Sequence, residues 1–161
     1  MAERLPKHKR EVPLALVLAF CGASFIGLQA LFGHLLTLAA TLLRGAHGMA
    51  TDTFILPTSN PGVIATMTVL NAGIAGAILL GAIGLLRLSA ASRLFLKTAL
   101  TLDVLMFVVV LIVDRFLLYQ PPPDSLEVSL VFTLGEIAII LLLERQSVRV
   151  ALGETPPARV P

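Results

Sequence analysis

The chain has 161 residues, of which 57% are hydrophobic and 14% are charged, and its mean hydropathy is +0.92. A soluble domain needs more charged side chains than this to cover its surface, so the composition excludes a soluble globular protein and predicts that lipid is the outer solvent. The formal net charge is +2. The only cysteine, Cys21, lies in an apolar block, which excludes disulfides within the chain and metal-binding cysteine clusters.

Four apolar blocks are each long enough to cross a hydrocarbon core, which takes about 20 helical residues. They predict an all-α polytopic membrane protein in which four transmembrane helices form an antiparallel bundle. The transmembrane domain is expected over residues 12–144, with spans at 12–33, 62–86, 94–118 and 126–143. A basic segment, 1–11, precedes this domain, and the Gly and Pro residues of the tail, 145–161, favour a short disordered end.

The first apolar block, Val12–Leu43, is longer than one crossing requires, because as a single helix it would extend ~48 Å against a hydrocarbon core of ~30 Å. The large Phe20 stands where a lipoprotein cleavage site needs a small residue, so we expect an uncleaved signal-anchor helix. Gly33 predicts an end or a bend. Polar residues at helical spacing over 34–44 then predict an amphipathic segment that lies at the outer interface or projects beyond it.

The later elements have recognisable boundaries. Asn60 and Pro61 are a typical helix start and open the second span. A short basic connection, 87–93, predicts that the second and third helices are antiparallel neighbours. Three consecutive prolines, 121–123, end the third helix, and the fourth begins near Ser125.

Small residues recur at every fourth position on the first two predicted helices. Such stripes let helix backbones approach closely, which matters where lipid removes the hydrophobic drive for association. The sequence leaves open whether they meet within one bundle or join two copies, and packing within the chain is favoured. The stripes are Ala19, Ala23 and Gly27 on the first helix, and Gly73, Ala77 and Gly81 on the second.

The distribution of basic residues predicts the orientation. Residues 1–11 hold four Lys or Arg, residues 87–97 hold three and the tail holds three, so ten of the twelve lie on one side. Arg44 and Arg115 are on the other. This bias predicts that both termini are cytoplasmic and that the protein is a multi-pass protein of the inner membrane. Since the basic residues flank spans in short segments, the expected partner is the lipid bilayer, and nucleic acid is not a partner.

Asp103 and Glu136 are the candidate functional residues, because they are acids inside predicted spans. Each lies ~12–14 Å from the cytoplasmic end of its helix. An ionised carboxylate near the bilayer centre costs roughly 2.5–3.5 kcal/mol on insertion scales. No Lys or Arg in the sequence shares that depth. The acids are therefore protonated, share a proton, are wetted by a cavity, or pair with a cation of another protein.

Other polar residues in the spans are a candidate lining. Ser129 and Thr133 fall on the same face of the fourth helix as Glu136, at positions i, i+4 and i+7. They line a narrow polar pathway open to the outside or, alternatively, make interhelical hydrogen bonds worth about 0.6–1 kcal/mol each. The candidate lining residues are Ser129 and Thr133 on the fourth helix, Thr68 and Asn71 on the second and Gln29 on the first.

The remaining chemistry-bearing residues form no diagnostic pattern. His34, His47 and Asp52 are the best outer metal set, but their spacing is not that of a known metal site, so no metal is predicted. The sequence holds no nucleophile–base pair and no phosphate-binding glycine loop. We therefore predict no catalytic residues and no cofactor, and an enzyme is unsupported.

Residues 84–88, Gly-Leu-Leu-Arg-Leu, followed by Ser92-Arg93, resemble a turn common among small uncharacterised four-helix bacterial inner-membrane proteins. In those proteins the second helix ends in a Leu-Leu-Arg turn and the third starts with a basic residue. The resemblance implies the four-helix fold and carries no activity.

Two functions remain. The first is a non-enzymatic accessory or assembly subunit of a larger membrane complex, favoured by the small size, the small-residue stripes and the possibility that a partner's Arg or Lys neutralises an acid. The alternative is a small oligomeric transporter or proton-coupled permease in which Asp103 and Glu136 titrate. Because four helices alone seldom enclose a pathway, the alternative requires self-association.

Overall fold

The computed structural model of the protein describes residues 12–44, 61–112 and 126–154, and these are helical, with no strand among them. The basic segment, the outer loop with His47 and Asp52, and the end of the third span lie outside these described residues, and so do the predictions made for them. The helices are α1 (Leu14–Arg44), α2 (Pro61–Leu85), α3 (Ala90–Ile112), α4 (Leu126–Leu143) and the short α5 (Gln146–Ala151).

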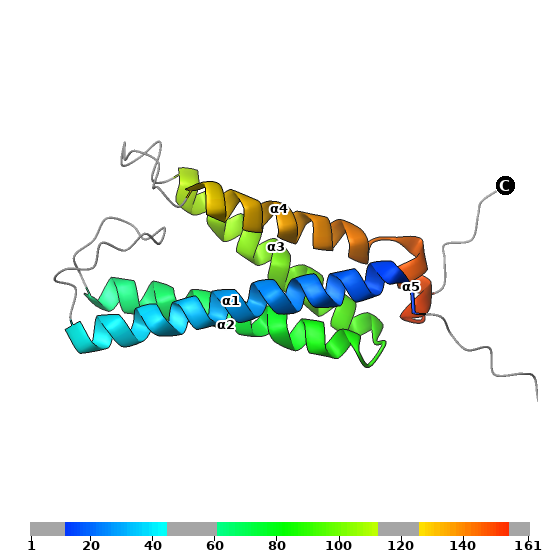
Figure 1. Cartoon of the computed structure of the whole chain (residues 1–161), viewed down its shortest axis with the longest axis horizontal. Helices are drawn as coiled ribbons and strands as arrows, with labels where there is room; N and C mark the ends of the chain where they lie inside the picture. Colours follow the sequence, from blue (N-terminus) through cyan, green and yellow to red (C-terminus); the bar gives the residue numbers. More distant parts are fainter. Residues whose placement is uncertain (1–11, 45–60, 113–125, 155–161) are drawn as a thin grey trace, which may run out of the picture.

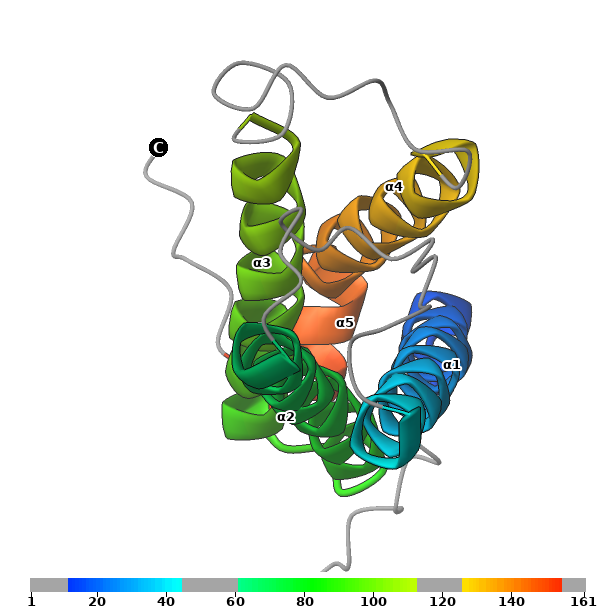
Figure 2. The same cartoon turned by 90° about the vertical axis from the view of Figure 1, so that its left-hand side faces the viewer.

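Four of these helices are long and apolar enough to cross a membrane, which confirms the predicted all-α, multi-pass class. Their apolar segments are Leu14–Leu43, Ala65–Leu85, Ala90–Ile112 and Leu126–Leu143. α1 and α2 lie side by side along most of their length, α3 packs on α2, and α4 packs on α1 and α3 (Figures 1 and 2).

The first helix differs from the prediction, because α1 continues through Gly33 for a total of 31 residues. The hydroxyl of Thr37 donates a hydrogen bond to the Gly33 carbonyl at 3.0 Å, and that of Thr41 donates to the Thr37 carbonyl at 2.8 Å. A single glycine inside a helix costs only about 1 kcal/mol relative to alanine, so it does not have to end or bend the helix. Residues 34–44 therefore extend α1 and do not form a separate segment.

The connection between α2 and α3 is shorter than predicted, because α3 begins at Ala90 and includes Arg93. The turn is closed by backbone hydrogen bonds from Arg87 N–H to the Gly84 carbonyl and from Leu88 N–H to the Leu85 carbonyl. Leu88 has a φ of 50°, which is uncommon for a residue with a side chain. This tight turn sets α3 directly against α2.

The glycines of the two small-residue stripes lie in different environments. On α1, a Cβ added at Gly27 would lie 2.9 Å from Cγ of Leu79 and 3.2 Å from the Ala75 carbonyl oxygen, so this stripe contacts α2. On α2, a Cβ added at Gly81 would lie 2.8 Å from Cβ of Leu96, so it contacts α3. Gly73, at the other end of its stripe, has nothing within 4 Å.

The buried core is concentrated at one end of the bundle, which we call the α5 end because α5, the start of α1 and the α2–α3 turn lie there (Figure 1). Toward the opposite end, α3 and α4 diverge from α1 and α2 (Figure 1). Burial follows this geometry: no residue of α3 described after Leu100, and none of α4 before Glu136, is buried. The buried residues of these two helices are Arg93, Leu96, Ala99 and Leu100 on α3, and Glu136, Ile139 and Leu143 on α4.

The prediction of a disordered tail is wrong for residues 145–154. Val148 and Leu152 are four positions apart and bury their side chains in the core, at 0% and 4% exposure. α5 ends at Ala151, and Gly153, with a φ of +86°, lies in the turn that follows. The Gly153 N–H donates to the Val150 carbonyl and the Glu154 N–H donates to the Arg149 carbonyl. This pair of bonds is the Schellman arrangement, in which glycine supplies the left-handed residue.

The close approach at Gly81 makes a testable prediction. Gly81→Ala forces a Cβ against the backbone of Leu96, at 2.9 Å from its Cα, and we expect it to lower the free energy of unfolding by about 1–3 kcal/mol. Gly76→Ala is the matched control, because nothing lies within 4 Å of that position and alanine favours the helix by about 0.5–1 kcal/mol. Unfolding by denaturing detergent, followed by circular dichroism, measures both. Equal effects of the two substitutions would contradict the packing of α3 on Gly81.

Candidate functional site

The acids predicted to matter, Asp103 and Glu136, come together between α3 and α4. A side-chain hydrogen bond links their carboxyl groups. Glu136 is buried at 4% exposure, and Asp103 is half-buried. Residues from two helices, separated by more than thirty positions in the chain, therefore form one intramembrane pair.

The helical repeat explains why both acids point inward. Asp103 follows Leu96, Ala99 and Leu100, the buried face of α3, at the next helical interval. In the same way, Glu136 precedes Ile139 by three residues on the buried face of α4. Each acid thus stands at the end of the apolar stripe, where the core of the α5 end gives way to the diverging half of the bundle.

A hydrogen bond between two carboxyl groups requires a proton, because an ionised carboxylate only accepts. The nearest basic residues on α3, Arg93 and Lys97, are engaged by Glu144 and Glu154 at the end of the bundle. Of the four states that the sequence left open, this contact fits the two in which the pair carries a proton, either shared between the acids or on each of them.

His34 is a third titratable residue near the acid pair, although the sequence analysis placed it at the outer interface. It is half-buried on α1 and interacts electrostatically with Asp103. The predicted break at Gly33 obscured this position. The signal that could have found it is the spacing, because His34 follows Gly27 by seven residues and continues the inward-facing stripe of the unbroken helix.

The candidate lining residues fall into different environments. Ser129 and Thr133 are half-buried on the Glu136 face of α4, and the Thr133 hydroxyl donates to the Ser129 carbonyl at 2.9 Å. On α2, Thr68 is buried at 2% exposure and Asn71 is half-buried. Gln29 is exposed on α1 and stands apart from this partly buried set.

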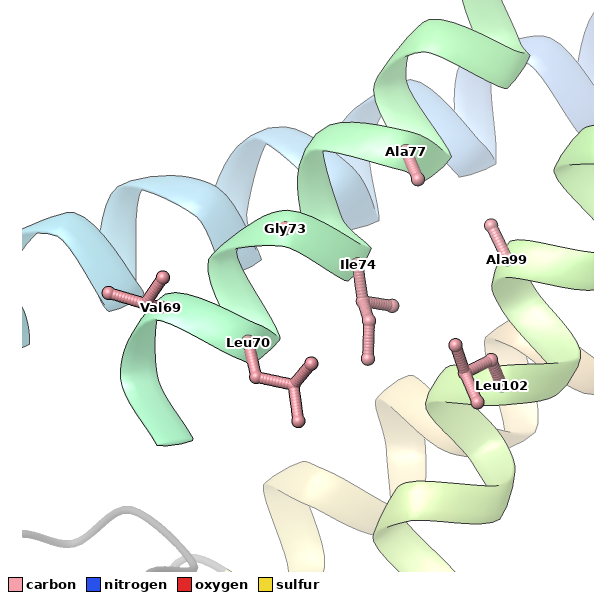
Figure 3. Close-up of a pocket in the computed structure, with 7 residues that line it drawn as sticks. All are labelled: Val69, Leu70, Gly73, Ile74, Ala77, Ala99 and Leu102. Atoms are coloured by element: carbon pink, nitrogen blue, oxygen red, sulfur yellow. The ribbon is translucent and has the colours of Figure 1, made fainter. Parts of the chain in front are cut away.

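An open apolar groove of about 430 Å³ lies between α2 and α3 (Figure 3). Ala77 and Ala99 point toward one another across it, and Gly73 leaves its floor without a side chain (Figure 3). Its lining is entirely apolar, so it suits a hydrocarbon chain or an apolar helix face and no polar ligand. The lining residues are Val69, Leu70, Gly73, Ile74, Ala77, Ala99 and Leu102.

Metal and thiol chemistry find no support among the described residues. No group of three or more His, Cys, Asp and Glu side chains in the described ranges could hold a metal ion. Cys21 is an exposed free thiol on α1. The outer set of His34, His47 and Asp52 includes two residues outside the described ranges and remains a sequence hypothesis.

Comparison with known proteins finds no family model, no curated protein and no solved structure that matches this chain. The resemblance of the turn at residues 84–93 to small four-helix bacterial membrane proteins therefore stays a prediction. Any function has to be argued from the chain's own residues, and the acid pair is the strongest starting point.

The proton that a hydrogen bond between two carboxyl groups requires gives an infrared test of the pair. We expect the protein in lipid to show the infrared C=O band of a protonated carboxyl when the pair is formed, and Glu136→Gln to remove it. Glu127→Gln is the control, because Glu127 is exposed at the start of the same helix. A band that survives both Glu136→Gln and Asp103→Asn would contradict a proton held between these two acids.

Proposed function

We propose that the protein is a small proton-coupled permease of the inner membrane, active as an oligomer, in which Asp103 and Glu136 bind and release the coupling proton. The observation that carries this proposal is the hydrogen bond between the two carboxyl groups in the interior of the bundle. Acids that satisfy each other inside one chain do not need the cation of a partner. That weakens one of the arguments by which the sequence favoured an accessory subunit.

The position of the pair supports the same function. On the α5 side the pair is followed by fully buried apolar side chains, Leu100 at 0% and Ile139 at 5% exposure. On the other side, the described residues of α3 and α4 are not buried. With both termini cytoplasmic, as the distribution of basic residues predicts, this arrangement corresponds to a proton site open toward the outside and sealed toward the cytoplasm.

The polar residues beyond the pair supply a route to it. Ser129 and Thr133 precede Glu136 along the same face of α4, and His34 lies on α1 within electrostatic range of Asp103. Side chains of this kind relay protons through the interior of membrane proteins. A complete pathway still requires a second copy, because four helices do not enclose one.

The permease makes a direct prediction for proton flux. In liposomes with an imposed membrane potential and an internal pH-sensitive dye, Glu136→Gln and Asp103→Asn are expected to reduce proton entry at least about tenfold, because each removes a proton-transferring group. Glu127→Gln should leave the flux unchanged. Variants that keep full flux, or that lose it only because the protein no longer assembles, would show that the pair is structural.

A second candidate, the accessory or assembly subunit, is favoured by the groove between α2 and α3. Its small residues permit a transmembrane helix of another protein to approach closely, and its lining is apolar throughout. The two functions separate on purification from native membranes in mild detergent with mass identification of all bound proteins. Only copies of this chain are expected for the permease, and a stoichiometric different protein for the subunit. A monomer alone would contradict both.

The groove gives the subunit hypothesis its own test. Gly73→Leu places a side chain in the groove and is expected to displace a bound partner at least about tenfold, through a loss of close packing worth about 1–3 kcal/mol. Gly33→Leu is the matched control, because Gly33 is also exposed with nothing within 4 Å but lies on α1. If co-purification of the partner survives Gly73→Leu, the groove is not its binding surface.

A further inference from the structure

An ionic network joins α3 to the tail at the α5 end. Arg93 is buried at 9% exposure, and its Nε lies 2.7 Å from Oε1 of Glu154. Its Nη1 lies 3.3 Å from the Leu143 carbonyl oxygen and 3.4 Å from Oε1 of Glu144. One guanidinium of α3 therefore reaches the end of α4 and the turn that follows α5.

Two further contacts complete the network. Nζ of Lys97 lies 2.5 Å from Oε1 of Glu144, and Nε of Arg149 lies 2.9 Å from Oε2 of Glu154. Glu154 thus bridges the two arginines, with Oε1 on Arg93 and Oε2 on Arg149. Because Glu154 follows Gly153 and the Schellman turn, its carboxylate position is tied to the fold of α5 itself.

The segment held by this network covers the end of the core. Val148 and Leu152 are buried among the apolar residues of the α5 end, and they are the two residues that the tail contributes to this core. The layer that they complete lies between the end of the bundle and the acid pair. Along α3, Arg93 and Asp103 are ten residues apart, or about 15 Å.

We propose that α5 and Glu154 form a latch that closes the α5 end of the bundle beneath the acid pair, and that breaking the Arg93–Glu154 contact opens this end. The latch itself follows from the contacts above. Its purpose, to admit water or a proton to the pair from the side of the termini, rests on the proposed permease function.

The interactions that hold α5 in place allow it to detach from the end of the bundle. A six-residue helix is too short to be stable alone, so α5 depends on Val148, Leu152 and the ion pairs. When Glu154 leaves, Arg93 keeps its contacts with Glu144 and the Leu143 carbonyl. Opening therefore does not strand a buried unpaired charge, which would be strongly unfavourable.

The charges keep the latch closed at neutral pH. Hydrogen bonds from Arg149 and then Arg93 hold the pKa of the Glu154 carboxyl below its usual range, and Lys97 does the same for the pKa of Glu144. A lowered carboxyl pKa contributes stability above the ordinary value, and that stability is lost as the pH falls through the lowered one. Among the described residues, three basic side chains face the two carboxylates: Lys97 acts on Glu144, and Arg93 and Arg149 act on both acids.

Thiol labelling tests the latch in the full-length protein. In a Cys21→Ser background, Val148→Cys places a single thiol at a fully buried position, and its reaction with a membrane-impermeant maleimide is followed in liposomes. Glu154→Gln is expected to speed this labelling about tenfold, as the loss of a charge-assisted hydrogen bond predicts. Arg149→Gln removes the Arg149–Glu154 contact and leaves the Arg93–Glu154 contact in place, so it should have a smaller effect in the same direction.

Matched controls decide the outcome. Arg145→Gln removes a basic residue of the same tail that makes no ion pair among the described residues, and it should leave labelling unchanged. Ser147→Cys, at an exposed position of α5, gives the rate of a freely accessible thiol. Labelling of the Val148→Cys protein at that rate, or an equal effect of Glu154→Gln and Arg145→Gln, would overturn the latch.

The link to function has a separate readout. If the latch admits protons to the acid pair, Glu154→Gln raises the proton flux of liposomes severalfold, and Glu136→Gln cancels that increase. Faster labelling without a change in flux would overturn this link while leaving the latch in place. A flux that does not depend on Glu136 at all would instead overturn the permease.

Discussion

The close approach of helix backbones at small residues is the constraint on which the rest of the structure depends. Lipid surrounding the spans provides no hydrophobic drive for their association, so packing has to come from contact. Gly27 brings α1 against α2, and Gly81 brings α2 against α3. With these distances fixed, α1 and α3 are held so that His34 lies within electrostatic range of Asp103. The polar site is thus a consequence of apolar packing elsewhere.

The fourth helix is held differently. One side of α4 packs on α1, where a Cβ added at Gly22 would lie 3.1 Å from Cδ1 of Ile139. Its contacts with α3 include the carboxyl pair in the interior and the Lys97–Glu144 ion pair at the end. α4 is therefore held on α1 through a close approach at glycine, and on α3 through polar contacts at two levels. A change of charge at either level is therefore expected to act first on the contact between α3 and α4.

The sequence predicts the class of this protein well and its interior only in part. Four spans follow from composition and length, and the two acids follow from polarity inside those spans. The predicted end or bend at Gly33 is wrong because a single glycine weakens a helix by only about 1 kcal/mol, and the rest of the long apolar helix outweighs that cost. The helical tail was missed because its support is non-local. The pairing of Arg93 with Glu154 joins residues 61 positions apart, and counting basic charges for orientation does not reveal which of them turns inward.

The unbroken α1 has a consequence for the surrounding bilayer. Its 31 residues measure about 46 Å, half as long again as a typical hydrocarbon core of ~30 Å. A helix of this length must tilt or emerge from the hydrocarbon, and each choice carries a small cost per ångström of mismatch. Because α2 is packed along α1 and α3 is packed on α2, we expect the three helices to tilt together. Membrane thickness then acts on the tilt of this unit, which makes the local lipid composition a determinant of its orientation in the bilayer.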